Sequence, residues 1–271
     1  MLSEMVIRND KRAAGTAGNA GYMIWILLKK ELLEQLRRGQ LLTVVIVFLF
    51  FGILSPAAAQ FTPLLLEKLG ESQQIMITVP EPGIIDAYAQ YIKNFTQLVP
   101  LILIFITMGG IAKEKEKGTL VFLLVKPVSR ASMMAAKALA SVIATTIGLA
   151  VGILSFILYS LLIFGPFDTV SFIAGNGLIL LYFITLVIVV QALNTGFSRP
   201  SQAGIAALAV WLLSVIMQAL PKVGTFSFTR LGTLAQGIFI GGEFAWEPVI
   251  ASVVLMAAAS LFGYLRFRNW E

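Results

Sequence analysis

The chain contains six apolar stretches without a single Asp, Glu, Lys or Arg, and each approaches the length of a membrane span. A helix needs about 20 residues to cross the hydrocarbon core of a bilayer. Lipid offers the backbone no hydrogen-bond partner, so a helix that bonds to itself is the favoured spanning structure. The six stretches cover residues 41–59, 98–112, 138–164, 172–197, 202–220 and 248–265. They predict an all-α integral membrane protein with six transmembrane helices.

Composition supports this class and excludes several functions. The chain is 58% hydrophobic and 13% charged, whereas soluble domains carry about 25% charged residues. It has no cysteine and no histidine, which excludes disulfides, thiol nucleophiles, imidazole bases and most transition-metal sites. A net charge of +6 could suggest a nucleic-acid partner, but the positions of the charges favour a membrane protein without one.

The basic residues predict the orientation of the spans. With the N-terminus inside, sixteen Lys and Arg residues fall on the inner side and four on the outer side, while the acidic residues divide equally. This is the positive-inside pattern of membrane proteins. Both termini are therefore expected in the cytoplasm.

Residues 1–21 are polar, rich in Ala and Gly, and expected to be flexible; residues 22–271 form the single membrane domain. Residues 22–39 predict an amphipathic helix lying in the membrane interface, and the alternative is a soluble helix packed on a partner. Lys29 lies at the apolar edge, where its stem can snorkel. The apolar face carries Trp25, Leu28, Leu32 and Leu36, and the polar face carries Lys30, Glu31, Glu34, Arg37 and Arg38.

Two further segments lie between spans. The loop over residues 60–97 is long and broken by prolines, and we expect a short helix of its own over 84–95. Residues 221–247 are rich in Gly and Phe and predict short interfacial or re-entrant helices. The alanines at 57–59 after an apolar run resemble a signal-peptide cleavage site, but the run begins forty residues in, so an uncleaved first span is expected.

Catalysis has little support in the sequence. No Gly-Lys pair occurs, so the chain lacks a Walker A loop for nucleotide phosphates. Glu114 and Glu116 are two residues apart and would face different directions on a helix, which makes a poor acid–base pair. The chain is therefore expected not to be an enzyme, and no metal-ligating set was found.

Small and polar residues within the spans have two interpretations each. Gly148 and Gly152 match a motif for the close approach of two helices. It indicates packing within the chain, and a dimer face is the less favoured alternative. Some polar residues could line a pathway, although such groups are often satisfied by neighbouring helices. The possible pathway residues are Tyr159, Gln191, Asn194 and Gln218. No ionisable group lies within a span, which disfavours an ion-coupled carrier.

The stretch 113–137 between the second and third spans is the strongest functional signal. It carries six basic residues and, inside the charged segment, an apolar block at 120–125 that ends before Pro127. Ser129 is placed to cap the next helix, whose first turn begins at Arg130. The plain interpretation is a solvated inner loop. The alternative is a short apolar helix that protrudes on the inner side of the membrane and fits into the groove of a partner protein.

This stretch resembles the cytoplasmic connection of type-2 ABC exporter permeases, whose pattern is Glu-x-Glu-Arg/Lys-Gly-Thr-Leu, then Pro-hydrophobic-Ser-Arg, then a basic residue seven positions on. The six-span layout, the segment before the last span, and the Lys29-Lys30-Glu31-Leu32 segment also resemble that family. Ala136 departs from it, since many members have Gly there. The matching residues are Glu114, Glu116, Lys117, Gly118, Thr119, Leu120, Leu124, Pro127, Val128, Ser129, Arg130 and Lys137.

The resemblance implies a permease subunit that forms the translocation pathway in a prokaryotic plasma (inner) membrane. It implies two separate ABC ATPase subunits, which bind ATP and magnesium, and a second permease as homodimer or heterodimer; this chain would hold no cofactor. The short helix in 113–137 would be the coupling helix, seated in a groove of the ATPase. Apolar contact would come from 120–124, including Phe122 and Leu123. Glu114, Glu116, Lys117 and Arg130 would give flanking ionic contacts, and Gly118 a tight approach.

Two other functions stay open at this point. A membrane scaffold without its own pathway would not make ATP hydrolysis respond to a translocated molecule. An ion-coupled carrier would transport without any ATPase. The substrate is not specified by these residues, although apolar spans lean slightly toward a lipid, a hydrophobic drug or an amphipathic peptide.

Overall fold

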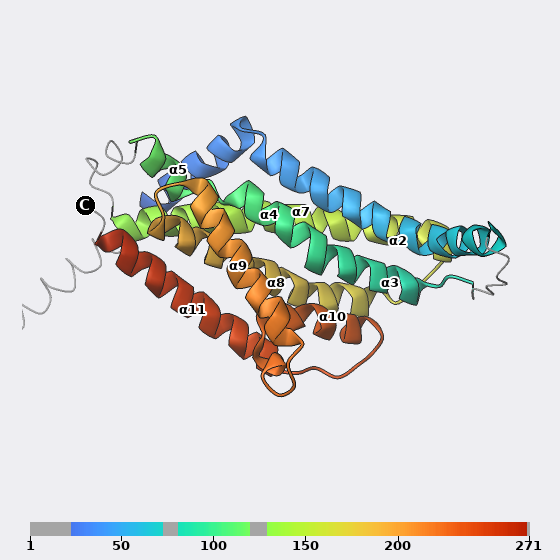
Figure 1. The fold of residues 1–271 in the computed structure, drawn as a ribbon. Coiled ribbons are helices and arrows are strands. Elements are labelled where there is room, and N and C mark those ends of the chain that lie inside the picture. Colours follow the sequence, from blue (N-terminus) through green and yellow to red (C-terminus); the bar gives the residue numbers. More distant parts are fainter. Residues whose placement is uncertain (1–22, 73–80, 120–128, 270–271) are drawn as a thin grey trace, which may run out of the picture.

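The computed structural model describes residues 23–72, 81–119 and 129–269, and all regular structure in these ranges is helical (Figure 1). Six helical segments within them are long and apolar enough to cross a membrane, which confirms the predicted number of spans. Each contains or closely overlaps its predicted stretch. The six segments are Gln40–Pro63, Ile84–Glu116, Arg130–Phe164, Thr169–Gly196, Pro200–Gln218 and Glu247–Arg268.

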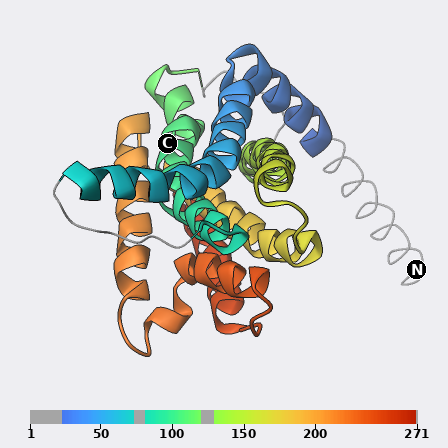
Figure 2. The same cartoon turned by 90° about the vertical axis from the view of Figure 1, so that its right-hand side faces the viewer.

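The first span belongs to a helix, α2 (Gln40–Ser72), that is longer than predicted. Residues 60–72, which the sequence assigned to a loop, continue the helix instead. Pro56 and Pro63 lie inside it, and proline bends a helix because it removes a backbone donor and crowds the preceding turn. Figure 2 shows the last part of α2 turning aside from the bundle. The prolines therefore bend the helix without ending it.

The second span is built from several helical pieces in a row: α3 (Ile84–Lys93), a π-helical turn (Asn94–Leu98), α4 (Val99–Thr107) and α5 (Ile111–Glu116). The predicted short helix at 84–95 exists, but it runs directly into the span and is not separate from it. Pro100 explains the irregular turn, since it has no N–H to offer the carbonyl of Thr96. The hydroxyl of Tyr182 donates to that carbonyl at 3.1 Å.

The helix α8 (Thr169–Gly196) is the central element of the bundle. It is packed by α7 (Arg130–Phe164), α9 (Pro200–Gln218), α10 (Leu231–Phe239) and α11 (Glu247–Arg268) (Figure 1). A cluster of aromatic rings fills the interior around it, including Phe172, Phe156 and Tyr91. Large apolar side chains on the outer helices stay exposed, as expected where lipid replaces water.

Glycines bring α2 and α7 into close contact. A Cβ atom on Gly148 would lie 2.8 Å from Val44 Cγ1, and one on Gly152 would lie 3.0 Å from the Phe48 carbonyl oxygen. Real Cβ atoms avoid such distances, so only glycine permits the helices to approach this closely. The Gly148–Gly152 motif therefore packs against α2 of the same chain, which is the first of its two predicted interpretations.

Between α9 and α11, residues 224–239 form two short 3-10 turns (Gly224–Phe226 and Phe228–Arg230) followed by α10. The predicted short helices in this region are thus present. Phe239, the last residue of α10, packs on α8, where a Cβ atom on Gly175 would lie 2.4 Å from its ring. The bundle has two ends, which we name the α5 end and the α10 end after the short helix at each.

Candidate functional site at the α5 end

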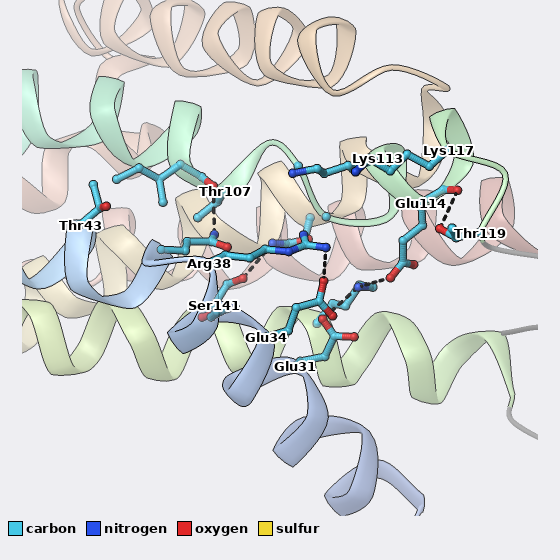
Figure 3. A pocket seen from close by; sticks show the side chains of 17 residues that line it. Glu31, Glu34, Arg38, Thr43, Thr107, Lys113, Glu114, Lys117, Thr119 and Ser141 are labelled. Carbon is cyan, nitrogen blue, oxygen red and sulfur yellow. Dashed lines mark hydrogen bonds and ion pairs between the residues drawn. The ribbon is translucent and has the colours of Figure 1, made fainter. Parts of the chain in front are cut away.

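A buried lysine joins three elements at the α5 end. Lys137, in the second turn of α7, is only 6% exposed. Its Nζ donates to Glu31 Oε2 at 2.9 Å and lies 2.8 Å from Glu114 Oε1. Glu31 belongs to the N-terminal helix (residues 23–37) and Glu114 to α5. In Figure 3 dashed lines connect the labelled carboxylates of Glu31 and Glu114 through the lysine between them. One ammonium group thus holds both elements to α7.

A second set of ion pairs extends this network along the N-terminal helix. Lys30 Nζ lies 2.9 Å from Glu31 and 3.3 Å from Glu34, and Arg38 lies 2.5 Å from Glu34. Burial alone would lower the pKa of Lys30, but the hydrogen bond and charge of Glu31 and the charge of Glu34 outweigh it and raise that pKa. These pairs are partly exposed, and such pairs contribute about 0–1 kcal/mol each.

The pKa of Glu31 is set by the same competition with the opposite sign. Burial would raise it, but the charge and hydrogen bond of Lys137, together with those of Lys30, outweigh burial and lower the pKa. Glu31 is therefore ionised at neutral pH. Removing one partner of a buried ion set destabilises the folded protein by about 3–5 kcal/mol, because an uncompensated charge stays buried.

The break between α4 and α5 positions Glu114. Residues 108–110 leave the helix, and the neighbouring helices supply donors for the carbonyls freed there. Asn194 Nδ2 donates to the Thr107 carbonyl at 3.2 Å, and Gln40 Nε2 donates to the Ile106 carbonyl at 2.9 Å. A Cβ atom on Gly110 would lie 2.5 Å from Gln191 Oε1. Glycine at this point of the turn leaves Gln191 in place, and α5 restarts directly after it.

The helix α5 ends at Glu116, and the chain turns at Gly118, whose φ of 67° lies in the left-handed region that favours glycine. The N–H of Gly118 donates to the Lys115 carbonyl at 3.0 Å, which satisfies one carbonyl of the last turn. A structural reason for Gly118 in the motif is therefore the termination of α5. Glu116, Lys117, Gly118 and Thr119 are exposed in the structure.

The start of α7 is as predicted. Ser129 is its N-cap, and Ser129 Oγ accepts from the Ser132 N–H at 3.0 Å. Arg130 Nη1 donates to the carbonyls of Phe267 and Arg268 at 2.7 and 2.6 Å, at the C-terminus of α11. A cation at a helix C-terminus interacts favourably with the helix dipole. Arg130 thus binds the last span, a contact that the sequence did not suggest.

The apolar part of the stretch 113–137, the predicted coupling segment, lies outside the described residues. This part contains the predicted contact residues Leu120, Phe122, Leu123, Leu124 and Pro127. Both flanks are described, and Glu114 on one side and Lys137 on the other meet in one ion network.

The N-terminal helix is present over residues 23–37; its place in the membrane interface stays a prediction, but one polar residue lies elsewhere than predicted. Glu31, assigned to the polar face, is buried against the bundle together with Leu28 and Gln35. Trp25 and Leu36 are exposed at 63% and 55% and Leu32 is half-buried, while Lys29 is exposed on the same side. The reason for the difference is Lys137, a partner 106 positions away that a helical projection cannot include.

The possible pathway residues divide between the two ends of the bundle. Gln191 and Asn194 are buried near the α5 end of α8, and Gln191 Nε2 donates to Ser141 Oγ at 2.9 Å. Tyr159 lies near the end of α7 and Gln218 is the last residue of α9, both on the side of the α10 end and partly buried. The four do not form one cluster, and their role in a pathway stays a prediction.

Sequence reasoning missed the pairing of Glu31 with Lys137. In the sequence Glu31 belongs to the amphipathic segment 22–39, and Lys137 belongs to the stretch 113–137. A lysine next to the start of a membrane span is a signal that a carboxylate partner is required. The sequence does not indicate which of the nearby carboxylates meets it.

These features define a helical, multi-pass membrane protein whose charged α5 end is tied together by buried ion pairs. Residues 25–271 match the family model described as ABC-2 family transporter protein, and the chain belongs to this family. The chain is similar to a protein of Bacillus subtilis (strain 168) named uncharacterized transmembrane protein YxlG, with 25% identity over 90% of this chain and 97% of that protein.

It is also similar to a protein of Pseudomonas aeruginosa named probable ABC transporter permease protein NosY. The identity is 28%, over 72% of this chain and 68% of that protein. The family match agrees with the six spans and with the motif that suggested a permease. The chain is therefore a membrane subunit of the ABC-2 transporter type.

Proposed function

We propose that this chain forms the translocation pathway of an ATP-driven exporter and receives its energy from two separate ABC ATPase subunits. The ATPases bind at the α5 end, through the segment between α5 and α7. ATP and magnesium belong to those subunits. A second permease, identical or different, completes the pathway in a prokaryotic plasma membrane.

The observation that carries this proposal is the ion network at the flanks of the segment. Glu114 precedes the segment, Lys137 follows it, and both are joined to Glu31 of the N-terminal helix. A displacement of the segment would therefore act on α5, α7 and the N-terminal helix together. Because α7 is one continuous helix from Arg130 to Phe164, movement at its start would be carried across the membrane.

The distribution of charge supports a cytoplasmic position of the α5 end. The N-terminal helix, α5, the start of α7 and the end of α11 all lie there, and they carry most of the described basic residues. The four basic residues that the sequence assigned to the outer side belong to other segments: Lys68, Lys93, Lys222 and Arg230. By the positive-inside rule the α5 end faces the cytoplasm, where the ATPases are.

A pull-down from the native membrane tests the proposal. The tagged protein is expected to recover an ABC ATPase in about equal amount, together with any second permease. Replacing Leu120, Leu123 and Leu124 by serine should abolish that recovery, because the apolar contact with the ATPase groove is lost. The matched control places serine at Val223, which is exposed at the α10 end, and should recover the ATPase as the native chain does.

ATP hydrolysis by the recovered complex gives the second readout. We expect the serine variant of the segment to lose the stimulation of hydrolysis by transported molecules. A preparation that is active in transport but holds no ATPase would contradict the proposal and favour a carrier. An ATPase that binds equally well to the segment variant would place the contact elsewhere.

A further inference from the structure

A cavity of about 300 Å³ lies at the α5 end and is lined by six elements (Figure 3). The N-terminal helix, the start of α2, the end of α4, α5, α7 and α8 all contribute to its wall. The network of Lys137 forms one side of it. Other lining residues, among them Gln35, Gln191, Lys113 and Lys117, make no ion pair with that network.

The cavity contains acceptor oxygens that lack donors. Gln35 Oε1, Gln191 Oε1 and Glu114 Oε2 are buried and make no hydrogen bond in the structure. Gln35 and Gln191 are 8% and 4% exposed, and both line the cavity. Buried polar groups in folded proteins are nearly always satisfied. These oxygens therefore call for hydrogen-bond donors from a molecule inside the cavity.

The charge of the cavity favours an anion. Its three carboxylates, on Glu31, Glu34 and Glu114, are paired with basic groups. Lys113 and Lys117 also line it, and among the described residues neither forms an ion pair. Figure 3 shows their side chains along one side of the pocket, across from Glu31 and Glu34. The balance of charge is thus positive, which disfavours a metal cation.

One class of molecule satisfies both requirements. A phosphate ester of a small polyol has a negative phosphate for Lys113 and Lys117 and hydroxyl donors for Gln35 and Gln191. We propose that the cavity binds such an ester, with the phosphate at the two lysines and the hydroxyls at the two glutamines. This proposal concerns a bound molecule at the α5 end and does not depend on the ATPase.

The position of the cavity indicates where the ester would come from. The N-terminal helix that forms one wall exposes Trp25, Ile26 and Leu33 on its outer side. An apolar face next to basic residues is typical of a helix in the membrane interface, where anionic headgroups gather. A lipid with a glycerol headgroup, phosphatidylglycerol, is therefore the expected source, and a soluble ester is the other.

Native mass spectrometry of the delipidated full-length protein tests the site. The probes are phosphatidylglycerol, phosphatidylcholine, glycerol 3-phosphate and inorganic phosphate, each titrated separately. We expect phosphatidylglycerol to bind at least about tenfold more tightly than phosphatidylcholine, which has no headgroup hydroxyl or net charge. Glycerol 3-phosphate that competes for the site would support the chemistry and identify a soluble source as well.

Three variants decide which residues bind. Lys113→Gln combined with Lys117→Gln should weaken phosphatidylglycerol binding about tenfold or more. Gln35→Glu, which keeps the size of the side chain, should also weaken it because a carboxylate repels the phosphate. Arg266→Gln combined with Arg268→Gln is the control, since it also removes two positive charges at the same end, but both residues are exposed and neither lines the cavity.

Each variant is accepted only if it is monodisperse and keeps the native helix content, so a loss of binding is not a loss of fold. Equal binding of phosphatidylglycerol and phosphatidylcholine would overturn the proposal. So would a Lys113/Lys117 variant that binds no worse than the Arg266/Arg268 variant. Inorganic phosphate that binds as tightly as either ester would show that the hydroxyl contacts do not exist.

Discussion

At the scale of single residues, Lys137 joins α7 to α5 and to the N-terminal helix. Its ammonium lies between two carboxylates in a site where all three side chains are at most 13% exposed. Substitution Lys137→Met keeps the apolar stem but leaves Glu31 and Glu114 without their shared cation. We expect a loss of about 3–5 kcal/mol in the free energy of unfolding. Thermal and denaturant unfolding in detergent measure it.

The control for this prediction is Lys29→Met, an exposed lysine two positions before Glu31, which should change stability by less than about 0.5 kcal/mol. Combining Lys137→Met with Glu31→Gln should cost less than the sum of the two changes, because the second removes a charge that the first left unpaired. Additive costs would show that the two groups do not interact.

The lowered pKa of Glu31 predicts a pH dependence. A carboxylate with a lowered folded-state pKa contributes stability above its unfolded value, here 4.5, and loses that contribution as the pH falls through the folded value. The raised pKa of Lys30 acts in the opposite range, since its contribution is complete below 10.5 and is lost at higher pH. Stability of the native chain should therefore be level near neutral pH and fall in acid.

Unfolding temperatures of the native chain and Glu31→Gln, followed over pH in the same detergent, test this dependence. The variant should be less stable at neutral pH, and the difference between the two proteins should shrink below the unfolded pKa of the carboxylate. A difference that stays constant into acid would mean that Glu31 is not ionised in the folded protein.

At the scale of elements, the turn between α4 and α5 determines where the flank of the coupling segment lies. Gly110→Ala would place a Cβ atom 2.5 Å from Gln191 Oε1, so either the turn or the glutamine must move. We expect a loss of about 1–3 kcal/mol and, if α5 shifts, a weaker Glu114–Lys137 contact. Gly109→Ala is a close control, because its Cβ atom would meet only Lys113 Cδ at 3.8 Å.

Stability of both alanine variants in detergent gives the comparison, and ATPase stimulation in the recovered complex gives a second readout. Gly110→Ala should lower both the stability and the ATPase stimulation, whereas Gly109→Ala should leave both unchanged. Equal behaviour of the two variants would show that the close approach to Gln191 does not position α5.

The elements also show what the sequence could predict. The six spans follow from uncharged apolar runs, and Ser129 as N-cap follows from its hydroxyl before the first turn of α7. The predicted ends of the first and second spans differ from those in the structure. The predicted loop began at residue 60 and contained Pro63, but α2 continues past that proline, as a helix does when the freed carbonyl is satisfied. Such compensation comes from contacts that the local sequence does not contain.

At the scale of the whole molecule, the two ends of the bundle have different chemistry. The α5 end combines buried ion pairs, a polar cavity and the flanks of the coupling segment. The interior toward the other end is packed with aromatic rings around Tyr91 and Phe172. An apolar core joined to a charged end agrees with the proposal that the subunit receives a mechanical input at the α5 end.

The candidate site could be predicted only in part for the same reason. The motif at 113–137 was found because its residues are adjacent in sequence. Glu31, Gln35 and Gln191 come from elements far apart along the chain, and only the packed bundle brings them to one cavity. Charge in a membrane chain predicts that a partner exists, but the fold determines which one.

Cysteine crosslinking tests most directly whether the α5 end binds an ATPase. The chain has no cysteine, so Thr119→Cys introduces a single thiol at the exposed edge of the coupling segment, and Val223→Cys introduces one at the α10 end. After treatment of native membranes with a short thiol-to-amine crosslinker, we expect an ABC ATPase joined to the Thr119 variant and none joined to the Val223 variant. An ATPase joined to neither, or to the Val223 variant alone, would contradict the account.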